Sequence, residues 1–147
     1  MARKASTSGR AGLLASLVLV VAQAVAASGE QQDFALAEVA PGVFVHQGKH
    51  VGVEDPGRGD SANIGFIVGK NCVAVIDTGG SIATGQALLA AFRRTTRVPP
   101  CFVINTHAHF DHVLGNPAFA KLDGVQFVGH HLLPGALAES EGFFRQQ

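Results

Sequence analysis

The sequence contains no Trp and no Tyr, only two Cys among its 147 residues, and as many acidic as basic side chains. Two Cys cannot form a disulfide-dense scaffold or a four-thiolate metal site. A formal net charge of zero gives no sign of the clustered basic surface that nucleic acid requires, so we expect no nucleic-acid partner. With 47% apolar and 15% charged residues, the composition is that of a folded domain rather than a disordered chain.

The first 27 residues differ in composition from the rest of the chain. Three basic residues lie within the first ten positions, the apolar run 13–21 follows, and no acidic residue comes before Glu30. This order, ending in small residues around Ala27, is typical of a cleaved secretory signal peptide. The alternative is a membrane anchor, which needs about 20 strongly apolar residues. We therefore expect a signal peptide at residues 1–27, a mature domain at 28–147, and a secreted or periplasmic protein without a stable membrane anchor after cleavage.

Strands and helices are expected to alternate in the mature domain. The run 73–76 is apolar at every position, which is typical of a central strand covered on both faces. A helix that begins after Ser81 and ends before two consecutive Pro connects this run to the apolar strand 102–106. Strand, helix and strand in this order make parallel neighbours, so the fold class is α/β. We expect further strands at 34–39, 43–45, 63–69 and 125–128, helices at 113–121 and 132–140, and a loop at 48–61.

Four potential metal ligands fall within six residues directly after the strand 102–106. In an extended segment His107 and His109 project to the same side, and the turn into the next helix presents Asp111 and His112 to a second position nearby. Neutral imidazole and carboxylate suit zinc best, and iron and manganese remain open. The alternative is a solvated loop in which Asp111 only caps a helix. Because ligands of open α/β sheets collect at the carboxyl ends of strands, we predict a site for two metal ions here.

The segment 106–112 reads Thr-His-x-His-x-Asp-His and, together with the Asp-Thr-Gly turn at 77–79, resembles the motifs of the metallo-β-lactamase superfamily. The resemblance implies an αββα sandwich with His107 and His109 on the first metal ion and Asp111 and His112 on the second. It also implies that Asp77 is a carboxylate beside the site that orients a metal-binding imidazole. Other segments look most like secreted bacterial members named quinoprotein relay system zinc metallohydrolases; these are residues 39–43, 62–66, 75–80, 111–116 and 127–130.

The resemblance implies a zinc-dependent hydrolase with a small-molecule substrate. Two divalent ions that share a water lower its pKa from 15.7 toward about 7, which creates a metal-bound hydroxide at neutral pH. The ions also polarise a carbonyl oxygen, so an ester, a thioester or a lactam is the expected substrate class. Asp111 would orient the hydroxide or carry its proton to the leaving group, which makes it the expected catalytic residue. A single iron ion would instead favour oxidation of a sulfur compound.

The sequence departs from the family in the ligands that the second half of the family's fold supplies. Members supply a third His, a bridging acid and a final His from segments that would follow residue 147. We therefore expect the N-terminal half of the fold, with a truncated, inactive fragment or a non-enzymatic metal-binding module as the alternative to an enzyme. His130 and His131 lie at the end of a predicted strand, where we interpret them as a surface pair and not as ligands.

Cys72 and Cys101 each begin one of the two strands that we expect to be parallel neighbours. Both should therefore lie at the edge of the sheet opposite to the metal ligands. Neighbouring strands are about 4.8 Å apart, which allows disulfide geometry. In an exported protein the two residues form either a disulfide or two small buried thiols.

His46 and His50 border the Gly-rich loop 48–61. This loop either folds over the motif or is a solvated connection, in which case both His are polar residues at the end of a strand and in a loop.

Overall fold

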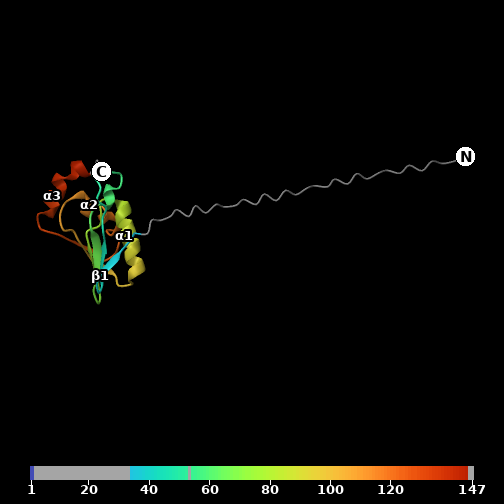
Figure 1. Cartoon of the computed structure of the whole chain (residues 1–147), viewed down its shortest axis with the longest axis horizontal. Coiled ribbons are helices and arrows are strands. Elements are labelled where there is room, and N and C mark those ends of the chain that lie inside the picture. Colours follow the sequence, from blue (N-terminus) through green and yellow to red (C-terminus); the bar gives the residue numbers. More distant parts are fainter. Residues whose placement is uncertain (2–33, 53, 146–147) are drawn as a thin grey trace. The chain divides into compact units, whose positions relative to one another are not determined.

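The computed structural model describes residue 1, residues 34–52 and residues 54–145 (Figure 1). Contacts divide the chain into two units, 1–31 and 32–147, and every described helix and strand belongs to the second. Apart from Met1, the predicted signal peptide and its cleavage point lie outside the described residues. Within the described ranges, no helix combines the length and the apolar character needed to cross a membrane.

Six strands of the described chain form one mixed sheet in the order of the sequence. The first four strands are antiparallel neighbours, whereas the fourth, fifth and sixth run parallel to one another. The α/β class and the parallel pair are therefore as expected. The strands are β1 (Ala37–Ala40), β2 (Val43–His46), β3 (Ile64–Val68), β4 (Val73–Ile76), β5 (Pro100–Ile104) and β6 (Gln126–Val128).

One long helix, α1 (Ile82–Thr95), connects β4 to β5 and covers one face of the sheet (Figure 1). It begins as predicted at Ser81, whose side-chain oxygen accepts a hydrogen bond from the backbone N–H of Thr84 at 3.0 Å. The rings of Phe66 and Phe92 meet edge to face in the core between the helix and the sheet. The buried core is formed by Ala62, Ile64, Phe66, Val73, Val75, Leu88, Leu89, Phe92, Val103 and Phe119.

The opposite face of the sheet is apolar but exposed. In the strand register Ile67 is paired with Ala74 and Ala74 with Phe102, so their side chains share one row on this face. Ile67 is 45% exposed, Phe102 38% and Val128 43%. Contiguous apolar surface of this kind usually marks an interaction site, against which another protein surface, a membrane or a ligand packs.

The helix predicted at 113–121 is replaced by two short pieces, α2 (Phe110–Val113) and the 3-10 turn η2 (Asn116–Ala118). The prediction was wrong because Gly115 packs directly against the β4–α1 turn. Its N–H donates to the carbonyl of Gly79 instead of continuing a helix, and a Cβ at this position would lie 2.0 Å from the carbonyl oxygen of Thr78. The remaining short elements are η1 (Arg58–Asp60), α3 (Leu133–Glu139) and α4 (Glu141–Phe144).

Cys72 and Cys101 are joined at the edge of the sheet where β4 and β5 begin, with their Cα atoms 5.7 Å apart. We predict this disulfide in the oxidised protein. Because it closes a segment of 29 residues, replacing both Cys by Ser should lower the free energy of unfolding by about 2–4 kcal/mol. Urea unfolding of the two proteins measures this difference. Two free thiols titrated in the denatured, unreduced protein would contradict the prediction.

Candidate metal centre

Asp77 lies at the carboxyl end of β4 and binds the segment that follows β5. Its Oδ1 accepts a hydrogen bond from the backbone N–H of Thr106 at 2.8 Å, and its Oδ2 accepts from the Thr106 hydroxyl and from Nδ1 of His112, both at 2.7 Å. Asp77 is 2% exposed and has a left-handed φ of 54°, which Asp tolerates better than most residues. Three hydrogen bonds compensate for burying this carboxylate.

The next residue, Thr78, holds the backbone of the motif. Its N–H donates to the carbonyl of His112 at 2.9 Å, and its hydroxyl donates to Oδ1 of Asn116 at 2.8 Å. Asn105 and Asn116 donate to each other's side-chain oxygens, at 3.1 and 2.8 Å. These contacts fasten the carboxyl ends of β4 and β5 and the start of η2 together beneath the motif.

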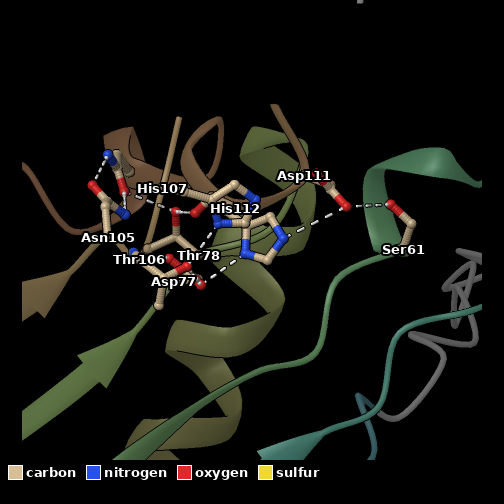
Figure 2. A network of polar contacts seen from close by, with 9 residues as sticks. Ser61, Asp77, Thr78, Asn105, Thr106, His107, Asp111 and His112 are labelled. Atoms are coloured by element: carbon tan, nitrogen blue, oxygen red, sulfur yellow. Dashed lines mark hydrogen bonds and ion pairs between the residues drawn. The ribbon is translucent and has the colours of Figure 1, made fainter. Parts of the chain in front are cut away.

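The imidazole of His112 lies between two carboxylates, Asp77 and Asp111, as Figure 2 shows. Asp77 accepts the proton of Nδ1, so in the neutral imidazole the lone pair of Nε2 is left for another partner. Nε2 lies 3.8 Å from Oδ2 of Asp111. Two potential metal-ligand atoms of different residues therefore face each other on the half-buried side of the motif.

Ser61 lies beside Asp111, on the side opposite to His112 (Figure 2). Its hydroxyl can donate to either of two acceptors, Oδ2 of Asp111 at 3.1 Å and the carbonyl oxygen of Arg58 at 2.8 Å. Sequence analysis missed this residue, because it is 50 positions from Asp111 and ends a loop with no motif of its own.

Of the other two predicted ligands, His107 lies beside His112 and His109 lies beside His107. The ring centroids of His107 and His112 are 4.0 Å apart, and those of His107 and His109 are 4.6 Å apart. Nδ1 of His107 lies 3.0 Å from the Thr106 hydroxyl, so the ring is connected to Asp77 through that hydroxyl. Pairwise contacts thus connect the four side chains of the motif: His109 to His107, His107 to His112, and His112 to Asp111.

The charges at the site shift the protonation of three groups. Burial alone would raise the pKa of Asp77, but hydrogen bonds from His112 and Thr106 outweigh it and hold that pKa below its usual value. The hydrogen bond to Asp77 raises the pKa of His112. Burial and the neighbouring His112 and His109 lower the pKa of His107, which favours its neutral, metal-binding form.

In the part of the chain that the structure describes, the side-chain atoms that could bind a metal ion come together in pairs and not in larger groups. Among the described residues, no three or more His, Cys, Asp or Glu side chains are arranged to hold one metal ion. A separation of 3.8 Å between Nε2 of His112 and Oδ2 of Asp111 is compatible with two ligands that each lie about 2.0–2.2 Å from one zinc ion. The donor chemistry of the motif therefore fits a divalent ion, with two ligands described for it.

His130 and His131 lie elsewhere on the surface. Both are exposed, their ring centroids are 4.1 Å apart, and Nδ1 of His130 accepts from the backbone N–H of Leu132 at 3.3 Å. No contact joins them to the four motif residues among the described contacts.

Imidazoles and carboxylates that cluster at the carboxyl ends of parallel strands are typical of the metal sites of α/β proteins. The sequence model of the metallo-beta-lactamase superfamily matches residues 57–147, which is more than half of the chain. The chain therefore belongs to the metallo-β-lactamase superfamily.

Solved structures of metallo-β-lactamases show the same fold. The enzyme from Hirschia baltica is 23% identical with a TM-score of 0.60, and the match covers 73% of this chain and 48% of that one. TMB-1 is 22% identical (TM-score 0.58; 73% and 47% covered), and FIM-1 from Pseudomonas aeruginosa in its mono-zinc form is 16% identical (0.58; 73% and 46%). The chain thus spans about half the length of these structures. The comparison with curated proteins gave no match.

Proposed function

We propose that this protein is a zinc-dependent hydrolase whose metal ions are held by His107, His109, Asp111 and His112. The observation that carries the proposal is the convergence of His112 Nε2 and Asp111 Oδ2, while Asp77 occupies the other imidazole nitrogen. A carboxylate that orients a metal-binding imidazole in this way is a usual part of zinc sites. Membership of the metallo-β-lactamase superfamily supports metal-dependent hydrolysis as the class of reaction.

The four ligands divide into two pairs in this proposal. His107 and His109, whose rings are neighbours, hold the first ion, and Asp111 and His112 hold the second. When bound, divalent ions lower the pKa of water and polarise a carbonyl oxygen. The chain's own part is to keep His112 in the tautomer with a free Nε2 and to present the Asp111 carboxylate, which can hold a proton during the reaction.

The substrate proposed is a small molecule with an ester, thioester or lactam carbonyl. We also propose that the chain is exported and cut near Ala27, which the mass of the protein recovered from a bacterial periplasm would test.

Zinc content and hydrolysis test the function together. We expect close to two zinc ions per chain, and turnover of an activated ester or a chromogenic lactam that a chelator abolishes and added zinc restores. The measurements are elemental analysis of the dialysed protein and absorbance assays with each substrate. Turnover that survives complete removal of metal would sink the proposal.

A second candidate, a chain that binds metal weakly and has no turnover, is favoured by two observations. The described donors come in pairs rather than in sets of three, and one apolar face of the sheet is exposed. This candidate requires less than one zinc ion per chain and strong fluorescence of a dye that binds apolar surface. Phe102→Lys should then reduce the fluorescence, whereas Leu132→Lys, which changes an exposed residue at the start of α3, should not.

A further inference from the structure

The buried imidazole of His46 lies at the end of β2, outside the motif, and is 8% exposed. Its Nδ1 donates to the carbonyl of Ala35 at 2.9 Å, and its Nε2 lies 2.6 Å from Oδ1 of Asp60. The ring of Phe34 stacks on it with a centroid distance of 3.8 Å. With both nitrogens occupied, His46 has no free atom for a ligand and acts on its surroundings through Asp60.

Asp60 is the last residue of η1, and this turn is held firmly next to the metal centre. The carbonyl of Gly59 accepts from the N–H of Gly80 at 2.8 Å and from the Thr84 hydroxyl at 2.9 Å. Gly80 leaves no room for a side chain, because a Cβ there would lie 2.9 Å from Cα of Asp111. The turn η1 is therefore fixed at two points. His46 holds the side chain of its last residue, Asp60, and the start of α1 holds the carbonyl of Gly59.

Ser61 follows Asp60 and connects η1 to Asp111. A hydroxyl has one hydrogen, and two acceptors lie near it: Oδ2 of Asp111 at 3.1 Å and the carbonyl of Arg58 at 2.8 Å. Because Arg58 belongs to η1, the position of this turn relative to Asp111 decides which acceptor receives the hydrogen. When Ser61 donates to Asp111, it uses one lone pair of Oδ2 and leaves another for the space shared with Nε2 of His112.

We infer that His46 and Asp60 are positioning residues that orient the Asp111 carboxylate through Ser61. The inference rests on the proposed function, since it assigns Asp111 to a metal ion. Partners that orient a metal ligand typically change metal affinity by about 10–100-fold when removed. His46 and Asp60 therefore belong to the metal centre in function although neither touches its donors.

The test is a double-mutant cycle on zinc affinity with the whole chain. Asp60→Ala and Ser61→Ala should each weaken zinc binding about 10-fold. Because both act through one hydrogen bond, the double variant should lose about the same factor and not about 100-fold. Asp60→Asn, which keeps an acceptor for His46, should bind zinc like the wild type. Lys49→Ala is the matched control, because this side chain is 60% exposed and pairs with the other oxygen of Asp60.

A purely structural role gives a different pattern. In one such outcome, Asp60→Ala lowers the urea midpoint without changing zinc affinity. In another, the losses of zinc affinity caused by Asp60→Ala and Ser61→Ala multiply in the double variant. Either result overturns the inference. If the wild type binds no zinc, the proposed function fails, and the cycle is measured from urea midpoints of the metal-free chain. There Ser61→Ala should shift the midpoint in the wild type but not in the Asp60→Ala background, and shifts that add would overturn the inference.

Discussion

Asp77→Asn should leave the protein folded and weaken its zinc binding by about 10–100-fold. The N–H of Thr106 can only donate, so the amide oxygen of the new Asn must take the place of Oδ1. Its NH₂ group then stands where Oδ2 was and donates to Nδ1 of His112. The imidazole proton must move to Nε2, the nitrogen directed at Asp111, and a protonated nitrogen cannot bind a metal ion.

Asp77→Ala should act differently, because it removes the hydrogen bonds instead of changing the tautomer. Without the carboxylate, the donors of Thr106 and His112 lose their partner in a buried place, which we expect to cost about 3 kcal/mol of unfolding free energy. Ala also tolerates the left-handed φ of 54° less well than Asp does.

Three measurements check the two Asp77 variants. Urea unfolding gives the stability, zinc titration gives the affinity, and the ¹⁵N shifts of the His112 ring give its tautomer in the metal-free protein. Asp123→Asn is the control, since this residue is exposed and changes charge in the same way. Unchanged zinc affinity in Asp77→Asn would show that Nε2 of His112 is not a ligand.

The fold was predictable where local patterns decide it. The uninterrupted apolar run of β4, the N-cap Ser81 and the apolar strand β5 are local signals, and the observed strand, helix and strand agree with them. The helix at 113–121 failed because a tertiary contact overrides the local pattern. Gly115 is in contact with Thr78 and Gly85, which lie 30 or more positions earlier, and nothing in its neighbourhood of the sequence indicates this.

The sequence indicates the candidate donors of the site, but not the residues that support them. His107 and His112 are recognised from their spacing, and the structure places their rings 4.0 Å apart. Ser61 and Asp60 belong to a Gly-rich segment that the sequence describes only as a loop, and their contacts exist because η1 folds against the start of α1. His46 was interpreted either as part of a loop near the site or as a polar strand end; its burial depends on the distant Asp60 and Phe34.

The assignment of ligands to two ions predicts a simple stoichiometry. His107→Ala or His109→Ala should remove the first ion and leave the second, and Asp111→Ala or His112→Ala should do the reverse. A double variant with one substitution in each pair should bind no zinc. We expect the affinity for the lost ion to fall by more than about 100-fold, beyond the range for residues that only orient a ligand. Elemental analysis of the dialysed variants gives the count.

His130 and His131 provide the matched control for these variants, because they are two neighbouring exposed imidazoles on the same chain. The variant with both replaced by Ala should keep the zinc content of the wild type. If it lost an ion instead, the surface pair would be a ligand site and the division of the motif into two pairs would be wrong. If any single motif variant lost both ions, the four donors would form one cooperative site, which the pairwise geometry of the described residues does not predict.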